Sequence, residues 1–439
     1  LNPVLDLLSM QFGFPGANSV RTAIASSYEL SRTNAKRSTV EGAFISLENG
    51  TGYITAMIGG SKFETSNWFN RATQAFVQPG SAFKPLYYAA GIEKDVITPS
   101  TMLYDTQIVF VNADGTPYKP LNYKGEWKGP VSVRSALAHS MNVPSMKVLS
   151  RIDWNDAINI PARLLGLSQD ELPSRGFQMV MPYALGVVSV SPMEMAKAFA
   201  TFPNLGRETE PIAIRYIEDR NGRIVSEPEK LVREALMKKG SATQLISPQT
   251  AFIMTDLLQS TVSEGTLAGP REIAGGFGNM PMAGKTGTPQ NWSAAWTVGF
   301  SPYYTSAVWI GFDKGGNASL GTNQTGSMIA GPLWAKYMKA VHQNLAPRRF
   351  SYPDGGINYV EIVPKSGLLP PPDYTGTVRK EIFKTGTEPK IFDELTQKEE
   401  AQQEQLLKDL GNHLNSSLTV IDSTSMPDFL LDTDLKLND

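Results

Sequence analysis

The sequence lacks cysteine altogether and has only three histidines among its 439 residues. The absence of cysteine excludes disulfide bonds, thiolate metal ligands and cysteine nucleophiles. The few histidines leave little choice for a Ser-His-Asp triad and nearly exclude a metal site built from several of them. A long apolar run is also missing from the start of the chain, because the first apolar stretch, residues 4–14, is too short to span a bilayer.

The charge of the chain is nearly balanced, with a formal net charge of -2. This balance gives no electrostatic reason to expect binding to nucleic acid or to an anionic membrane surface. The hydrophobic content of 41% is enough for one large globular core or two modest ones. Since the chain begins with Leu1, we expect its N-terminus to be a cut end, with any targeting or membrane segment upstream.

Strand patterns lie early and late in the sequence, with helical patterns between them. Residues 43–58 and 296–312 are predicted as β-hairpins, and a third hairpin is predicted around Asn221-Gly222. Helices are predicted from about residue 131 to 138, from Ser191-Pro192 to about residue 204, and from Ser247-Pro248 onward. Helices inserted between the first and last strands of one sheet indicate an α/β (α+β) domain with a helical lobe.

A serine and a lysine three residues apart follow a predicted turn at Gln78-Pro79-Gly80. If a helix begins at Ser81, then Ser81 and Lys84 lie on one face of its first turn, about 5–6 Å apart at Cβ. The amine can then reach the hydroxyl. A helix start also gathers unpaired N–H groups, which suit an alkoxide or an oxyanion. The segment is therefore a candidate for a serine nucleophile with a lysine base.

Two further motifs are candidates for the same site. Ser140 and Asn142 are expected in a loop between helices, because Pro144 disfavours helical backbone at Val143. The segment Lys285-Thr286-Gly287-Thr288 is expected on a strand. Each motif alone is weak evidence, since such short patterns occur by chance, but the three in this order form a specific combination.

With this trio the chain resembles the transpeptidase domain of class A penicillin-binding proteins, the bifunctional cell-wall synthases of bacteria. The likeness covers roughly residues 40 to 345. It is carried by Ala56-Met57-Ile58-Gly59-Gly60, Phe69-Asn70-Arg71-Ala72, Gln78 to Pro85, Gly129-Pro130-Val131, Glu264-Gly265-Thr266, Gly284 to Thr288 and Thr325-Gly326. The resemblance implies a penicillin-binding protein/serine β-lactamase-like fold, with an antiparallel sheet flanked by helices, an all-helical lobe and the active site between them. It implies no metal and no organic cofactor.

The catalytic roles follow from the chemistry of lysine. A free lysine is neutral in only about one molecule in 2,500 at pH 7, so a lysine base needs its pKa lowered by burial or by a second cation. We hypothesise that Lys84 accepts the proton of Ser81 and that Lys285 is this second cation. Ser140 is expected to relay protons to the leaving amine, and Asn142 to orient Lys84 and a substrate amide.

The segment around Lys285 suits an anionic ligand. We predict that Thr286, Gly287 and Thr288 bind substrate, with the threonine hydroxyls holding a peptide carboxylate. The backbone N–H groups of Ser81 and Thr288 are predicted to form the oxyanion hole. The resemblance implies that the substrate is the peptidoglycan stem peptide ending in D-Ala-D-Ala, that an amine of a neighbouring strand is the acceptor, and that β-lactams acylate the same serine.

The sequence departs from the family pattern after the third motif. Pro289 stands where the family usually has threonine, and Ala294 stands where it usually has aspartate. We expect the missing carboxylate to alter the hydrogen bonding around this strand and the choice of the amine that accepts the acyl group. His139 is interpreted as structural, because adjacent residues such as His139 and Ser140 do not face each other on a helix.

The expected domain division is a linker or upstream remnant at residues 1–38, the transpeptidase domain at 39–350, a C-terminal extension at 351–395 and an acidic, flexible tail at 396–439. No acidic motif of a glycosyltransferase appears in residues 1–40, so we expect an upstream glycosyltransferase domain and a membrane anchor to be missing from this chain. The resemblance implies an extracytoplasmic location and cell-wall assembly proteins as partners.

Three other functions stay open from the sequence. A DD-carboxypeptidase uses the same site with water as the acceptor. A β-lactamase must add a base for deacylation, and no glutamate lies in a loop pattern that would supply it. A non-enzymatic β-lactam sensor or scaffold is the alternative from another class, and the intact trio argues against it.

Overall fold

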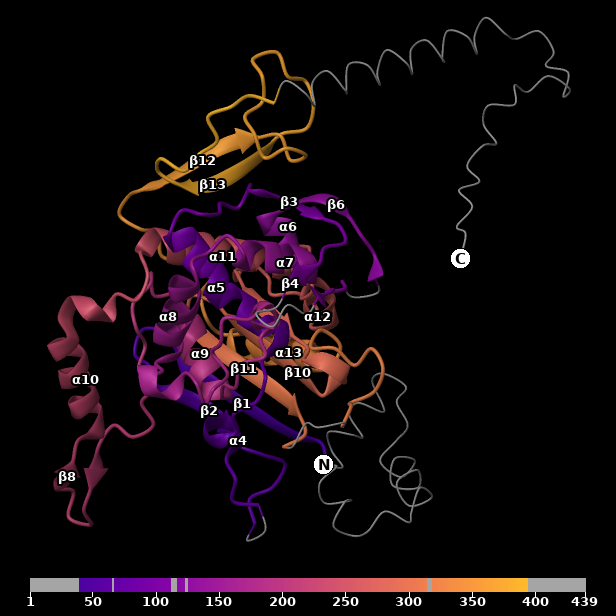
Figure 1. Ribbon diagram of the computed structural model, residues 1–439. Coiled ribbons are helices and arrows are strands. Elements are labelled where there is room, and N and C mark those ends of the chain that lie inside the picture. Colours follow the sequence, from indigo (N-terminus) through magenta and orange to yellow (C-terminus); the bar gives the residue numbers. More distant parts are fainter. Residues whose placement is uncertain (1–38, 65–66, 112–116, 123–124, 314–317, 394–439) are drawn as a thin grey trace, which may run out of the picture.

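The computed structural model describes residues 39–64, 67–111, 117–122, 125–313 and 318–393. Its centre is a five-stranded antiparallel sheet with the strand order β2-β1-β11-β10-β9 (Figure 1). The strands are β1 (Glu41–Glu48), β2 (Ile54–Ile58), β9 (Ala283–Gly287), β10 (Ala294–Phe300) and β11 (Tyr304–Gly311). Because β1 pairs with β11, strands from the two ends of the domain lie side by side and the chain between β2 and β9 is an insertion.

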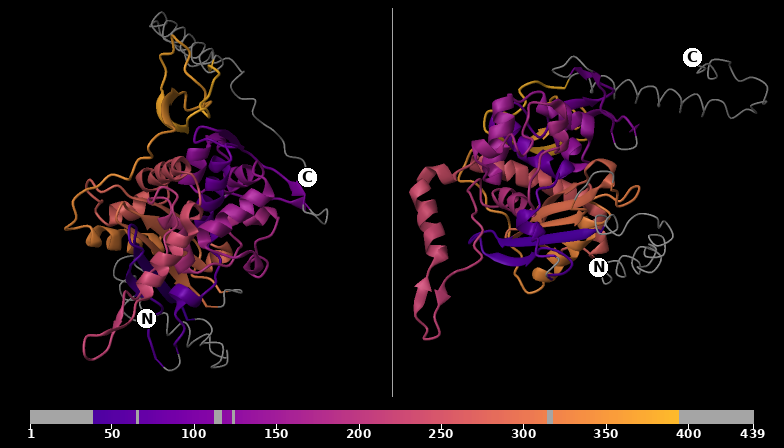
Figure 2. Two further views of the ribbon diagram at one scale, coloured as in Figure 1. Left: turned by 90° about the vertical axis from the view of Figure 1, so that its left-hand side faces the viewer. Right: turned by 60° about the horizontal axis from the view of Figure 1, so that its bottom comes forward.

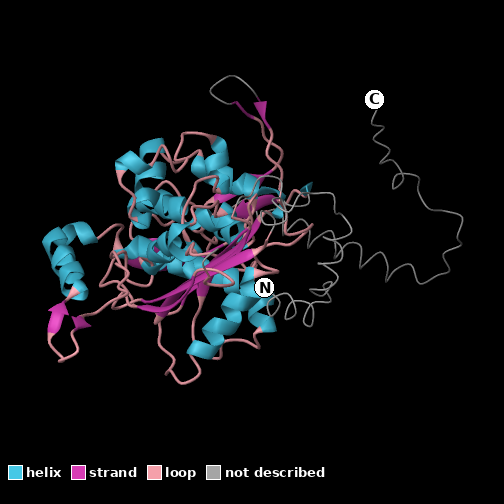
Figure 3. Cartoon of the chain, turned by 90° about the horizontal axis from the view of Figure 1, so that it is seen from below, coloured by secondary structure: helices cyan, strands magenta, loops and turns pink. Residues whose placement is uncertain are grey.

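The sheet separates two hydrophobic cores, because side chains along a strand alternate between its faces. Trp296 and Trp309 belong to the core on the face covered by α9 (Pro192–Ala200), whereas Ala295 and Ile310 belong to the core under α13 (Ala330–Val341). Helices therefore cover both faces of the sheet, as the view from below shows (Figure 3).

The insertion between β2 and β9 forms a helical lobe next to the sheet (Figure 1). Its main helices are α5 (Lys84–Glu93), α6 (Val133–Ala138), α7 (Asn142–Leu149), α8 (Trp154–Leu165) and α11 (Pro248–Ser263). Helix α11 packs against β9 as well as against α5 and α6, so it joins the lobe to the sheet. The short helices α4 (Arg71–Gln74) and α12 (Ala268–Ile273) lie at the two ends of this insertion.

Short strand pairs fill the long connection between α5 and α6. They are β3 (Met102–Asp105) with β6 (Gly129–Ser132), and β4 (Phe110–Val111) with β5 (Pro117–Tyr118). No helix in the described part of the chain is long and apolar enough to cross a membrane.

A hairpin and a helix project from the body of the molecule. They are β7 (Ile217–Glu218), β8 (Ile224–Ser226) and α10 (Pro228–Lys239), and they stand apart from the sheet in Figure 1 and in the right-hand view of Figure 2. Helix α10 has no buried residue. Its contacts with the body include hydrogen bonds from Tyr53 to Glu229 at 2.8 Å and from Arg233 to the carbonyl of Thr51 at 2.8 Å.

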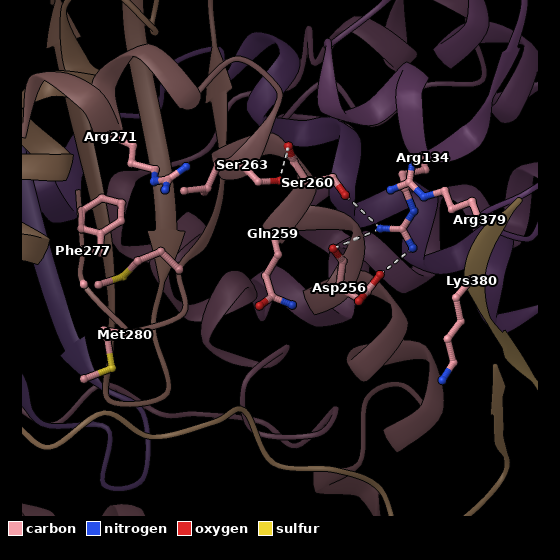
Figure 4. A pocket seen from close by; sticks show the side chains of 13 residues that line it. Arg134, Asp256, Gln259, Ser260, Ser263, Arg271, Phe277, Met280, Arg379 and Lys380 are labelled. Atoms are coloured by element: carbon pink, nitrogen blue, oxygen red, sulfur yellow. Dashed lines mark hydrogen bonds and ion pairs between the residues drawn. The ribbon is translucent and has the colours of Figure 1, made fainter. Parts of the chain in front are cut away.

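After the domain, β12 (Ile357–Ile362) and β13 (Arg379–Lys384) form a separate two-stranded sheet against the helical lobe. The guanidinium of Arg134 on α6, only 4% exposed, donates to Glu381 on β13 and to Asp256 on α11. Figure 4 shows the interaction of Arg134 with Asp256 beside α11. A buried ion pair of this kind fixes the position of the small sheet, because separating it leaves an uncompensated charge.

The predicted fold class is confirmed: an antiparallel sheet is flanked by helices and carries an inserted helical lobe. The three predicted hairpins are present, and helices begin at Pro192 and Pro248 as expected. Helix α9 ends at Ala200 rather than near residue 204. No sequence pattern predicted α8, α10 or α13. The proposed linker at 1–38 and the tail at 396–439 lie outside the described residues.

Candidate active site

Ser81 lies on a tight turn that leads directly into α5. The turn is a 3₁₀ helix, Gly80–Phe83, and α5 begins at Lys84, so the regular α-helix predicted from Ser81 starts three residues later. Side chains at i and i+3 eclipse each other in a 3₁₀ helix, which keeps Ser81 and Lys84 on one face. Ser81 is half-buried, whereas Lys84 is fully buried. The hydroxyl is therefore reachable and the amine is shielded from water.

The turn packs directly against the end of β9. Gly80 has φ +56, and a Cβ at this position would lie 2.7 Å from the carbonyl carbon of Thr288. A Cβ on Gly287 would likewise lie 2.2 Å from the carbonyl oxygen of Pro79. The indole N–H of Trp296 donates to the carbonyl of Gln78 at 2.9 Å. These contacts bring the backbone next to Ser81 and the backbone of Thr288 together, where the sequence predicted an oxyanion hole.

The amine of Lys84 is surrounded by three oxygen atoms. Its Nζ donates to the carbonyl oxygens of Ser140 at 2.8 Å and Met141 at 3.1 Å, and to Oδ1 of Asn142 at 3.0 Å. Burial lowers the pKa of Lys84 well below its ordinary value, and the positive charge of Lys285 lowers it further. The site therefore favours a neutral amine and still offers three acceptors to the ammonium that forms on protonation.

Ser140 connects the two lysines. Its backbone has φ +58, a left-handed conformation that is uncommon for a residue with a side chain. Lys285 donates from Nζ to the Ser140 hydroxyl oxygen at 2.8 Å and to the carbonyl of Thr286 at 2.9 Å. Burial lowers the pKa of Lys285 to about 7. Lys285 can therefore exchange a proton near neutral pH through the hydroxyl of Ser140.

One local prediction about this segment is wrong. Asn142 and Val143 belong to the first turn of α7 rather than to a loop, and only the stretch before them connects α6 to α7. Pro144 is the third residue of α7, where a missing N–H removes no intrahelical hydrogen bond. The first turn of a helix holds Asn142 more firmly than a loop would.

The threonines of the third motif lie among polar groups from two other loops. The hydroxyl of Thr286, a residue that is 5% exposed, donates to the hydroxyl of Thr266 at 2.8 Å, and Ser327 donates to the carbonyl of Thr266 at 2.7 Å. The Thr288 hydroxyl oxygen accepts the N–H of Gly326 at 3.0 Å and can still donate its own proton. Of the two threonines, Thr288 is the more accessible to a ligand.

Two polar residues that hold the first turn of α7, Asp105 and Asn122, were not predicted from the sequence. The side chain of Asn122 contacts the first N–H groups of α7, and its amide contacts the fully buried Asp105. Both residues come from the polar stretch between α5 and α6, where no spacing or motif chemistry marks them. The only signal was that a proline-punctuated polar stretch preceded the motif at Ser140.

Other candidates lie away from this cluster. His139 is exposed and its Nδ1 lies 3.0 Å from the carbonyl of Ser135, so it does not pair with the Ser140 hydroxyl. A polar cavity of about 420 Å³ lies beside α11 (Figure 4), and none of the predicted site residues lines it. Within the residues that the structure describes, no group of three or more His, Asp or Glu side chains could hold a metal ion.

Comparisons with known proteins match most of the chain. The family model described as penicillin binding protein transpeptidase domain matches residues 42–339. Penicillin-binding protein 1A of Aquifex aeolicus (strain VF5) is 33% identical over 355 residues, which is 80% of this chain and 44% of that protein. Penicillin-binding protein 1A of Neisseria lactamica is 36% identical over 318 residues, 72% of this chain and 38% of that protein. The chain thus spans less than half the length of these relatives.

Solved structures show the same architecture. The crystal structure of penicillin-binding protein 1A from Haemophilus influenzae has a TM-score of 0.70 and 28% identity, over 80% of this chain and 54% of that chain. The penicillin-binding protein PonA1 from Mycobacterium tuberculosis has a TM-score of 0.58 and 20% identity, over 86% of this chain and 91% of that chain, a similarity of fold.

Proposed function

The chain belongs to the penicillin-binding protein transpeptidase family, and from this premise we propose that it is a serine DD-transpeptidase that cross-links peptidoglycan stem peptides. The observation that carries the proposal is the meeting of three distant segments. Lys84 beside Ser81 donates to Ser140 and Asn142, and Lys285 donates to the hydroxyl of Ser140. This cluster supports the assignment of Ser81 as nucleophile, Lys84 as base and Ser140 as proton relay, and the proposed chemistry requires no metal.

The first half of the reaction forms an acyl-enzyme. The Ser81 oxygen attacks the carbonyl carbon between the two terminal D-alanines while its proton passes to the neutral amine of Lys84. The oxyanion is stabilised by the N–H groups of Ser81 and Thr288, and one such donor is worth about 2.7–4 kcal/mol in comparable enzymes. When the C–N bond breaks, the departing amine takes the proton of the Ser140 hydroxyl, which Lys285 replaces.

The second half returns every proton. The acceptor amine attacks the ester carbonyl and gives a proton to Ser140, which restores the proton of Lys285. The Ser81 oxygen leaves the acyl group and takes the proton held by Lys84. The pKa of about 7 for Lys285 suits this exchange, because a group that gives and takes a proton works best with a pKa near the working pH.

Substrate binding follows from the polar end of β9. We assign the free carboxylate of the stem peptide to Thr288, Thr286 and the charge of Lys285, with Gly287 allowing the Ser81 turn to approach closely. Asn142 is assigned to orient the substrate amide as well as Lys84. β-Lactams present a carboxylate and a reactive carbonyl in a similar arrangement and are expected to acylate Ser81.

The length of the relatives bears on what the intact protein contains. Because the relatives are more than twice as long as the part matched, we propose that the intact protein also has a glycosyltransferase domain and a membrane anchor, acts outside the cytoplasm and works with cell-wall assembly proteins. Residues 39–350 are then its transpeptidase domain.

A labelled penicillin tests the proposal. Mass spectrometry is expected to find the label on the peptide that contains Ser81, as a long-lived adduct that Ser81→Ala abolishes. Rapid release of hydrolysed label would instead indicate a β-lactamase. With a stem-peptide donor, transfer to an added amine distinguishes a transpeptidase from a carboxypeptidase, which releases the free acid. Full labelling and cross-linking by Ser81→Ala would contradict the proposal, and a wild-type chain that binds penicillin without cross-linking would favour a sensor or scaffold.

A further inference from the structure

Resting on the proposed function, we propose that Asp105 and Asn122 are positioning residues, which hold Asn142 with its carbonyl oxygen toward Lys84. Neither residue belongs to the three motifs. Asp105 ends β3 and Asn122 lies in the connection before β6, about twenty residues ahead of the Ser140 segment. The inference depends on a continuous series of hydrogen bonds from Asp105 to the amine of Lys84.

The first link is a helix cap supplied from outside the helix. The residue before α7 is Met141, and no side-chain cap is present there, because a thioether is at best a weak acceptor. The first N–H groups of a helix need acceptors. Oδ1 of Asn122 accepts the N–H of Asn142 at 3.2 Å and the N–H of Val143 at 3.1 Å. Asn122 therefore sets the position of the first turn of α7.

The second link fixes which way the Asn122 amide points. Its Nδ2 donates to Oδ1 of Asp105 at 2.6 Å, and the other oxygen of Asp105 accepts the N–H of Lys128 at 3.0 Å. Asp105 is 0% exposed. Since a carboxylate only accepts hydrogen bonds, the amide nitrogen must face Asp105 and the carbonyl oxygen must face the N–H groups of α7.

The third link fixes the orientation of the Asn142 side-chain amide in the same way. Its Nδ2 donates to the carbonyl of Leu121 at 3.2 Å, which leaves Oδ1 facing the amine of Lys84 at 3.0 Å. Leu121 is held in place because its neighbour Asn122 is bonded on both sides. A rotated Asn142 would present N–H groups to the N–H groups of Lys84 and lose this acceptor. Asp105 thus acts on the base without touching it.

An exchange of the two side chains tests this series. Asn122→Asp places two carboxylates against each other, and Asp105→Asn lets the Asn122 amide rotate, so each single variant is expected to displace α7. The double variant Asp105→Asn with Asn122→Asp restores an amide facing a carboxylate and keeps an acceptor for Lys128 and for α7; it loses only the exposed hydrogen bond from Asn122 to the carbonyl of Glu126 at 3.1 Å. Asn155→Ala, an exposed asparagine in the first turn of α8, serves as the matched control.

The readout is acylation of the full chain by a fluorescent penicillin over a range of concentrations. We expect each single variant to lower the saturating acylation rate by about 10²-fold, because a misplaced catalytic group costs on that order, while the dissociation constant for penicillin changes little. We expect the double variant to recover most of the rate. Melting curves establish that the proteins are folded, and Asn122→Ala replaces Asn122→Asp if that variant does not fold.

The outcomes separate this inference from the proposed function. If the wild type is acylated and both single variants react as fast as Asn155→Ala, or if the double variant is no faster than the singles, the positioning role is wrong and the proposed function stands. If the wild type takes no label at Ser81, the proposed function fails and the inference fails with it.

Discussion

The charge of Lys285 should destabilise the folded protein, and replacing it tests how large this penalty is. Lys285 is 0% exposed, and burial lowers its pKa from 10.5 to about 7. Between these values the unfolded chain binds more protons at this residue than the folded protein does. The stability of the wild type therefore rises as the pH rises from about 7 to 10.5 and falls in the opposite direction. Lys285→Met removes the titrating group and nearly keeps its length.

The expected size follows from the pKa. The difference between 10.5 and about 7 corresponds to about 5 kcal/mol for the fully charged lysine, of which about 4 kcal/mol applies at pH 7. The variant also loses the hydrogen bonds to the Ser140 hydroxyl and the Thr286 carbonyl, worth about 1 kcal/mol each. Lys285→Met should therefore be more stable than the wild type by about 2 kcal/mol at pH 7, and no more stable at pH 10.5.

Urea unfolding at pH 7 and pH 10.5 measures both values, with the exposed Lys62→Met as the control for a loss of charge alone. Penicillin labelling of the same samples should show a large loss of acylation in Lys285→Met and none in Lys62→Met. A gain in unfolding free energy that is the same at both pH values would refute the reasoning. So would a variant that is less stable than the wild type at pH 7.

Three other predictions follow from the same contacts. Asn142→Asp places a carboxylate about 3 Å from the amine of Lys84, which raises the pKa of Lys84, so the acid limb of the acylation rate should move to higher pH in a pH profile. Gly80→Ala forces a Cβ against the backbone at the end of β9 in a left-handed conformation, and urea unfolding should show a loss of about 1–3 kcal/mol together with lost labelling. Arg134→Met leaves the buried Glu381 without a cation, although its carboxylate still accepts the N–H of Ile382, and should lower the unfolding free energy by about 3–5 kcal/mol, whereas adding Glu381→Met should restore part of that loss.

The sequence was informative wherever a local pattern decides the structure. The aromatic and β-branched residues of β10 and β11 predicted a hairpin, because such side chains pack well in strands, and both strands are buried on both faces. Serine followed by proline predicted the starts of α9 and α11. The eclipsed spacing of Ser81 and Lys84 predicted a shared face whether the turn was α-helical or 3₁₀.

The sequence did not predict the features that depend on contacts between residues far apart in the chain. Helix α8 has Pro161 in its interior, which weakens a helix prediction, and its stability comes from packing on α5 and α9. The left-handed backbone of Ser140 was not predicted, because glycine is the residue that usually marks this conformation in a sequence. The pairing of Asp105 with Asn122 depends on the path of a long polar connection. The lowered pKa values of the lysines depend on burial that only the assembled lobe and sheet provide.

The strained conformation of Ser140 explains how two buried lysines can share one site. A left-handed residue of this kind costs about 1–3 kcal/mol and persists only where its surroundings fix it. Its carbonyl oxygen accepts from Lys84 and its hydroxyl accepts from Lys285. The backbone carbonyl of Ser140 thus accepts a hydrogen bond from one amine and its side-chain hydroxyl accepts one from the other, so both lysines have an acceptor in the same residue. The charge on Lys285 lowers the pKa of Lys84, so the proton is directed to Lys285 and the base stays neutral. Rotating the Ser140 backbone out of this conformation would move its carbonyl oxygen and its hydroxyl away from the positions in which they accept from Lys84 and Lys285.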